Sequence, residues 1–150
     1  MGELKTRPKK PQIENPEKER EDWISLLDQL VTKVNAWVQP DWATRVIKKA
    51  MGDSILGEYE APALLMQRDF ARVLLEPITR FAPGADGVID LYRMPAYDDI
   101  ASLYRVDGEW KLHYSFRGGK RIAGIRNTEP LPFTEGNFLR VLNEISDHGS

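Results

Sequence analysis

Hydrophobic residues between positions 16 and 38 recur at steps of three or four residues, which is the spacing of one face of an α-helix. The apolar positions are Trp23, Leu27, Leu30, Val34 and Trp37. Asn15 is a favourable N-cap, and Pro16 suits the first helical position. Pro40 ends the pattern. The sequence therefore predicts an amphipathic helix directly before Pro40.

Residues 41–51 fit two interpretations. Asp41 could cap a short helix that carries Trp42 and Val46 on one face and ends at Gly52. The β-branched residues in the segment 44–47 suit a first strand instead. Because residues typical of helix ends lie on both sides of the segment, we expect a short helix here.

From residue 57 onward the pattern becomes that of β-strands. The segments 59–66 and 70–78 are apolar and rich in branched residues, and the polar residues 67–69 between them predict a hairpin. Turn-forming residues follow at 81–87. Residues 88–93 are then expected to form a third strand.

The clearest hairpin signal is Asp107–Gly108, which lies between the apolar segments 100–106 and 109–116. This dipeptide favours a two-residue type I′ turn, and such a turn fixes the register of both strands. Counting outward from the turn gives the expected pairs, Leu103 with Leu112 on the core face and Ser102 with His113 on the other face.

Two further elements are predicted near the end of the chain. Gly118–Gly119 offers a second two-residue turn, leading into a strand over residues 120–126. Thr134 is a suitable N-cap for a short helix. Its apolar face would consist of Phe138, Val141, Leu142 and Ile145.

This order of elements predicts an α+β fold. We expect an antiparallel β-meander of about five to six strands, flanked by the N-terminal amphipathic helix and the short C-terminal helix. Residues 1–15 are basic and contain Pro8 and Pro11, so they are expected to form a disordered tail. Residues 16–150 are expected to form a single domain.

Composition narrows the possible chemistry. The 150 residues contain no cysteine and two histidines, which argues against disulfide scaffolds, thiolate metal sites, thiol catalysis and multi-histidine metal sites. We therefore expect no metal and no cofactor. The net charge of −2 favours no class of partner. No apolar run approaches the ~18–20 residues of a membrane span, so we expect a cytoplasmic protein without membrane contact.

Two groups of residues could support catalysis. Ser102, His113 and Asp98 share the polar face of the central hairpin and contain the side chains of a nucleophilic triad. A serine in the middle of a strand lacks the strained turn and oxyanion hole of such enzymes, so a solvated sheet face is the favoured interpretation and we expect no catalytic residue.

The second group is acidic. Glu109 and Lys111 have the acid-x-Lys spacing of some metal-dependent nucleases, and Asp90 or Glu76 could supply the other carboxylate. Asp86, Asp98 and Asp99 add to the acidic character of this part of the chain. A Glu-x-Lys segment beside a hairpin turn is more often a solvated surface, so this interpretation ranks third.

A basic group lies in the second hairpin. Arg117, Lys120, Arg121 and Arg126 occur with no acid between residues 117 and 128. In the expected turn, Arg117 and Lys120 would stand opposite each other, and tolerance of such a pair suggests that an anion binds there. These residues are the candidate site for nucleic acid or phosphate.

A third surface is apolar. Tyr92, Met94 and Tyr97 cannot all be assigned to the core by periodicity, and Tyr and Met are enriched at protein interfaces. The favoured hypothesis is a non-catalytic interaction module that binds a protein partner or forms a homo-oligomer. A nucleic-acid-binding or phosphate-binding accessory protein ranks second, and a small metal-dependent hydrolase or nuclease ranks third.

Overall fold

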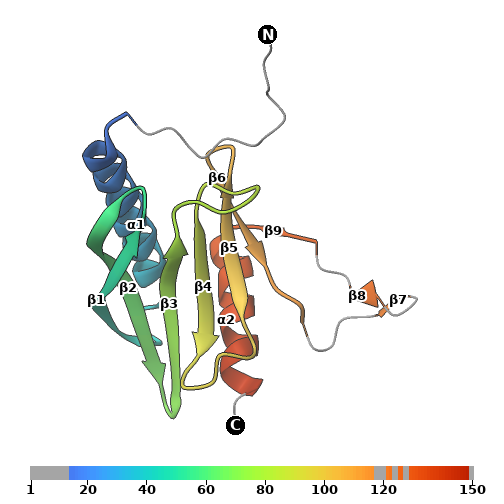
Figure 1. Cartoon of the computed structure of the whole chain (residues 1–150). Coiled ribbons are helices and arrows are strands. Elements are labelled where there is room, and N and C mark those ends of the chain that lie inside the picture. The colour runs from blue at the N-terminus through green and yellow to red at the C-terminus, as the bar shows by residue number, and fades with distance from the viewer. Residues whose placement is uncertain (1–13, 117–120, 123–124, 127–128, 149–150) are drawn as a thin grey trace.

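The computed structural model describes residues 14–116, 121–122, 125–126 and 129–148. An N-terminal helix, a seven-stranded antiparallel sheet and a C-terminal helix form the domain, as Figure 1 shows. The predicted α+β fold with an antiparallel meander is therefore confirmed, with one strand more than the expected five to six. The predicted tail lies almost wholly outside the described residues.

The first helix, α1, spans Pro16–Val38 and has the predicted ends. The side chain of Asn15 accepts a hydrogen bond from the backbone N–H of Lys18, and Pro16 occupies the first turn. The buried residues of α1 include Trp23 and Leu27, so the predicted apolar face is the one that contacts the sheet.

Six longer strands follow in chain order and pair with their sequence neighbours, and a short seventh strand completes the sheet. They are β1 (Ala43–Asp53), β2 (Gly57–Arg68), β3 (Ala71–Thr79), β4 (Val88–Arg93), β5 (Ala101–Val106), β6 (Glu109–His113) and β9 (Leu131–Pro132). Strand β9 pairs with β6 and was not predicted. Strand β1 is therefore the long edge strand of the sheet.

The expected helix at 41–51 is wrong, because residues Ala43–Asp53 form strand β1. This strand pairs with β2 without interruption from Ala43 to Asp53. Its β-branched residues suit the pleated backbone, and eleven consecutive pairings outweigh a favourable helix cap at Asp41. Trp42, the residue before β1, is buried, and the guanidinium of Arg68 stacks 4.4 Å from its ring centre.

Both predicted hairpins that fall on described residues are confirmed. Asp107 and Gly108 have positive φ angles of 52° and 80°, as a type I′ turn requires. The register of β5 and β6 is the expected one, including Leu103 opposite Leu112 and Ser102 opposite His113. Strands β2 and β3 form the other hairpin.

The second helix, α2, spans Glu135–His148, and the Thr134 hydroxyl accepts from the N–H of Asn137 as an N-cap. The predicted single strand at 120–126 is wrong. Instead, β7 (Arg121–Ile122) and β8 (Ile125–Arg126) pair with each other as a separate two-stranded sheet. The predicted Gly118–Gly119 turn lies outside the described residues.

One continuous core joins both helices to a single face of the sheet. It contains side chains of α1, α2 and every strand from β2 to β6, with Trp23, Leu64, Leu103, Leu112 and Phe138 among its most buried residues. Because α1 and α2 both contribute to this core, both helices cover the same face. The opposite face is left without a covering helix.

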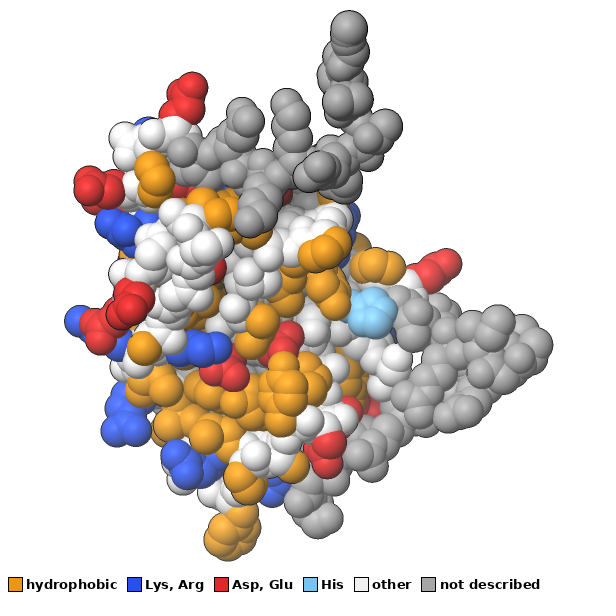
Figure 2. All heavy atoms as spheres, viewed as in Figure 1, with side chains coloured by type: hydrophobic (Ala, Val, Ile, Leu, Met, Phe, Trp, Pro, Cys, Tyr) orange, Lys and Arg blue, Asp and Glu red, His pale blue; other side chains and the backbone are white. Residues whose placement is uncertain are grey.

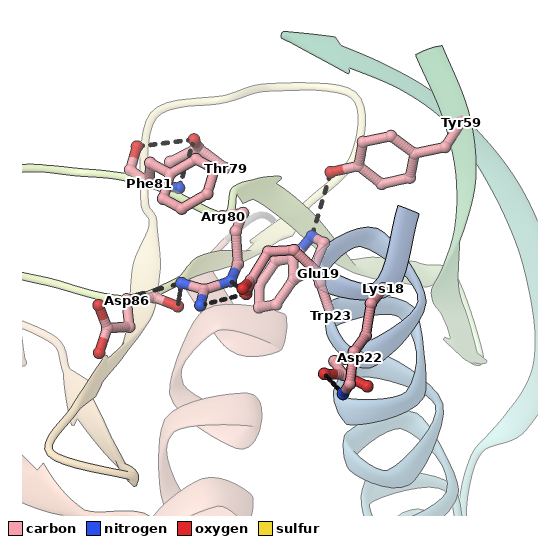
Figure 3. Close-up of polar contacts among 9 residues, drawn as sticks. All are labelled: Lys18, Glu19, Asp22, Trp23, Tyr59, Thr79, Arg80, Phe81 and Asp86. Atoms are coloured by element: carbon pink, nitrogen blue, oxygen red, sulfur yellow. Dashed lines mark hydrogen bonds and ion pairs between the residues drawn. The ribbon is translucent and has the colours of Figure 1, made fainter. Parts of the chain in front are cut away.

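Arg80 fixes the beginning of α1 against the loop between β3 and β4, as Figure 3 shows. Its guanidinium binds Glu19 at 2.7 Å and donates to the backbone carbonyl of Asp86 at 2.8 Å. Beside it, the indole N–H of Trp23 donates to the hydroxyl of Tyr59 at 3.1 Å. These bonds connect α1 to two separate parts of the sheet.

Candidate functional site

The candidate site is the sheet face opposite the helices, which we call the open face. A second, smaller apolar cluster lies there, consisting of buried Ala63, Leu65 and Leu74 with partly buried Ile47, Tyr92 and Met94 against them. Figure 2 shows this face, with apolar side chains gathered over its lower half. Basic side chains border this apolar area on the left and below in that view, and acidic ones lie above it and to its right.

A row of polar side chains crosses four strands beside this cluster. Glu76 on β3 is paired with Asp90 on β4, Asp90 with Ser102 on β5, and Ser102 with His113 on β6. Side chains at paired positions point to the same side of the sheet, so the row lies entirely on the open face.

Asp90 is the buried member of this row, with 6% of its surface exposed. Its carboxylate accepts a hydrogen bond from the Ser102 hydroxyl at 2.8 Å and another from the Tyr97 hydroxyl. A buried carboxylate is costly unless it is hydrogen-bonded, so these two donors allow Asp90 to occupy this position. Tyr97 reaches it from the loop after β4.

Glu76 stands directly opposite Asp90, and like charges at paired positions destabilise a sheet. Lys49 on β1 compensates, since its ammonium group lies 3.2 Å from the Glu76 carboxylate and donates to the Pro77 carbonyl at 2.7 Å. The Tyr92 hydroxyl also donates to Glu76 at 2.9 Å. Internal donors therefore engage both carboxylates of the row.

Burial and donation to a carboxylate both stabilise the protonated forms of the two tyrosines. Burial, followed by the hydrogen bond to Glu76, raises the pKa of Tyr92 to about 12. The hydrogen bond to Asp90, followed by burial, raises the pKa of Tyr97 well above its ordinary value. Both hydroxyls therefore remain protonated well into the alkaline range.

The structure brings the predicted residues Tyr92, Met94 and Tyr97 together on the open face. Tyr92 and Tyr97 meet edge to face with their ring centres 4.7 Å apart, and Met94 packs against the same cluster. Tyr97 is 53% exposed, which is high for so large a side chain. Their role in binding a partner remains a prediction.

The possible triad does not assemble. Ser102 and His113 are paired as expected, but the carboxylate that Ser102 contacts belongs to Asp90 and not to Asp98. Ser102 donates its only hydroxyl proton to that carboxylate from an ordinary position within strand β5. The arrangement stabilises a buried acid.

The possible nuclease residues are also apart. Glu109 contacts Lys111 at 3.3 Å and pairs with Val106, whereas Asp90 pairs with Ser102, four residues away along β5. Four residues of strand correspond to ~13 Å. No group of three or more metal-ligating side chains occurs in the part of the chain that the structure describes.

Of the basic candidates, Arg121 and Arg126 occupy directly paired positions of β7 and β8. Arg117 and Lys120 lie outside the described residues. The contact of Lys49 with Glu76 was not predicted, because it depends on β1 being a strand beside β2.

Within the described segments, neither helix is long and apolar enough to span a membrane.

Comparison with models of protein families, with curated proteins and with solved structures finds no match to this chain.

Proposed function

We propose that the protein is a non-catalytic binding module whose open face contacts another protein, either a different chain or a second copy. The observation that carries the proposal is the apolar cluster on the face that the helices leave uncovered, with Tyr92, Met94 and Tyr97 at its surface. Contiguous apolar surface of this kind commonly marks an interaction site.

The polar row supports a binding role over a catalytic one. The carboxylates of Glu76 and Asp90 are held by four donors, and Ser102 is one of these. A catalytic nucleophile or base needs a proton-transfer partner that is available to a substrate. Here the hydrogen bonds fix Tyr92 and Tyr97 as rigid aromatic contacts, which lowers the entropy lost on binding.

Affinity purification of the tagged protein from its own cells tests the proposal. Proteins retained by the wild type should be lost with the double variant Met94→Ala/Tyr97→Ala. Val106→Ala is the matched control, since Val106 is also an exposed apolar residue of the sheet but lies beside the Asp107–Gly108 turn. Circular dichroism should show that both variants are folded.

Two results would contradict the proposal. Equal capture by the wild type and the Met94→Ala/Tyr97→Ala variant would place the contact elsewhere. Loss of all captured proteins after nuclease treatment would favour the second candidate function, binding of nucleic acid.

That second candidate has one supporting observation, the paired positions of Arg121 and Arg126. Like charges opposite each other are destabilising unless an anion compensates them. If Arg117, Lys120, Arg121 and Arg126 each contact a phosphate, the affinity for duplex DNA should fall with salt with a logarithmic slope of about −3 to −4. A flat salt dependence would eliminate this candidate.

A further inference from the structure

Two exposed arginines border the apolar cluster of the open face. Arg45 on β1 lies at the end of a row that continues through Leu65 on β2, Leu74 on β3 and Tyr92 on β4. Arg72 precedes Leu74 by two residues on β3, which places it on the same face of the sheet. Both arginines are exposed.

These arginines differ from those whose charge is engaged within the fold. Arg80 binds Glu19, Arg93 donates to the Ser146 carbonyl, and Arg68 stacks on a tryptophan. Among the described residues, neither Arg45 nor Arg72 has an ion pair or a hydrogen-bonded side-chain partner. Their guanidinium groups are therefore available to carboxylates from outside the fold.

The positive charges of Arg45 and Arg72 indicate which kind of partner the open face can bind. The charged residues of segments 1–13 and 117–128 are mainly basic, so neither segment complements a pair of arginines. A second copy also fits less well, because the carboxylates on the open faces of β3 and β4 are held by Lys49, Ser102 and the two tyrosines. A partner with unpaired acidic side chains provides the negative charge that would pair with the two arginines.

The geometry favours a helical segment over an extended one. A sheet face presents side chains and offers no backbone hydrogen bonds, whereas a helix satisfies its own backbone groups. Arg45 and Arg72 lie two strands and two residues apart, which corresponds to ~12 Å between their Cα atoms. Residues i and i+7 of a helix are ~10.5 Å apart on one side, with i+3 and i+4 between them.

We propose that the open face binds an acidic amphipathic helix of a partner protein. Carboxylates near both ends of a two-turn stretch pair with Arg45 and Arg72, and the apolar side chains between them pack on the cluster around Leu74. This inference rests on the proposed function, since it names the class of partner that the same face accepts.

The test uses two labelled 18-residue peptides with leucine at positions i+3 and i+4 of each two-turn repeat. One peptide carries glutamate at i and i+7, and the other carries lysine there. Fluorescence anisotropy should show that the wild type prefers the glutamate peptide. Arg45→Gln/Arg72→Gln should weaken binding of that peptide about 5- to 30-fold, the sum expected for two exposed ion pairs.

Lys33→Glu is the matched control, because it changes the net charge by the same two units at an exposed position on α1. It should leave the affinity within about twofold of the wild type, since exposed charges beyond a Debye length are screened. Arg45→Glu/Arg72→Glu should reverse the preference and favour the lysine peptide. That reversal cannot result from unfolding, so it keeps the test decisive even if one variant is less stable.

Several outcomes would overturn the inference. One is the absence of a preference for the glutamate peptide, and another is an equal loss of affinity with Lys33→Glu. A dimer detected by light scattering and abolished by Met94→Ala/Tyr97→Ala would identify a second copy as the occupant. If affinity purification still depends on Met94 and Tyr97 but not on Arg45 and Arg72, the proposed function stands and the acidic helix is wrong.

Discussion

Gly87, at the end of the β3–β4 loop, has no space for a side chain. An added Cβ would lie 2.8 Å and 2.9 Å from two ring carbons of Trp23 and 3.5 Å from the ring of Trp110. Carbon atoms in contact prefer about 3.5–4.0 Å. Either the Trp23 ring or the loop must therefore move by several tenths of an ångström to accept Gly87→Ala.

Neither the Trp23 ring nor the β3–β4 loop can move without weakening other contacts. Trp23 is fully buried, and its indole N–H is bonded to Tyr59. The loop is held to β5 by two backbone hydrogen bonds, from the N–H of Arg105 to the Gly87 carbonyl at 3.0 Å and from the N–H of Asp86 to the Arg105 carbonyl at 2.7 Å. Overpacking costs about 1–3 kcal/mol, and weakening one of these bonds adds about 1 kcal/mol.

We therefore expect Gly87→Ala to lower the free energy of unfolding by about 2–4 kcal/mol, measured by urea denaturation followed by circular dichroism. For a domain of this size each kcal/mol corresponds to about 2–4 °C in Tm. Gly136→Ala is the matched control, since no atom lies within 4 Å of its added Cβ and it lies in α2. Alanine there should be neutral or stabilise by up to about 1 kcal/mol.

A cost below about 0.5 kcal/mol for Gly87→Ala, the range of ordinary surface substitutions, would refute this reasoning. It would mean that Trp23 does not press against the loop. The orientation of α1 on the sheet would then need revision, because Trp23 is the largest buried side chain of that helix.

Two further predictions follow from polar contacts. Arg80→Met should lower the free energy of unfolding by about 1–3 kcal/mol, because it leaves the partly buried Glu19 without its partner. Lys18→Met should leave the free energy of unfolding almost unchanged, because its ion pair with Asp22 is exposed. Equal losses for the two variants in denaturation would contradict this. Tyr92 has a folded-state pKa of about 12 against an ordinary value near 10, so the unfolded chain loses this proton first and stability should fall as pH rises from about 10 to 12. Denaturation at several pH values should show a shallower fall for Tyr92→Phe, and an identical slope would mean that Tyr92 titrates normally.

The parts of the fold that could be predicted are those with local causes. Asp107–Gly108 imposes its own backbone conformation, and once that turn forms, the pairing of Ser102 with His113 follows by counting. Asn15 and Pro16 likewise determine where α1 begins. In each case the chemistry that decides the structure lies within a few residues of the element.

Strand β1 shows where such local reasoning fails. Its conformation is decided by pairing with residues 57–67, which no cap at Asp41 can reveal. A local signal did exist at its other end, since the Asp53 carboxylate accepts from the N–H groups of Ile55 and Leu56 at 2.7 Å and 2.6 Å. Such an Asx-type turn is typical of a chain reversal and would have favoured a hairpin.

The candidate site was predictable in part for the same reason. Tyr92, Met94 and Tyr97 are candidates because periodicity does not assign all of them to the core, and that criterion needs no tertiary information. The contacts of Glu76 with Lys49 join β3 to β1 and therefore depend on the strand that was mistaken for a helix. The unpaired state of Arg45 is equally invisible without the position of β1.

Net charge is a poor guide to what the open face could bind, because the charges of that face are not equally available. The chain as a whole carries −2, which by itself predicts weak repulsion of an acidic ligand. On the open face, however, Glu76 and Asp90 are held by internal donors while Arg45 and Arg72 are not. At short range a ligand interacts with the charges it can contact, since more distant ones are screened by salt. Arg45 and Arg72 are therefore the charged groups beside the apolar cluster that remain free to contact a ligand.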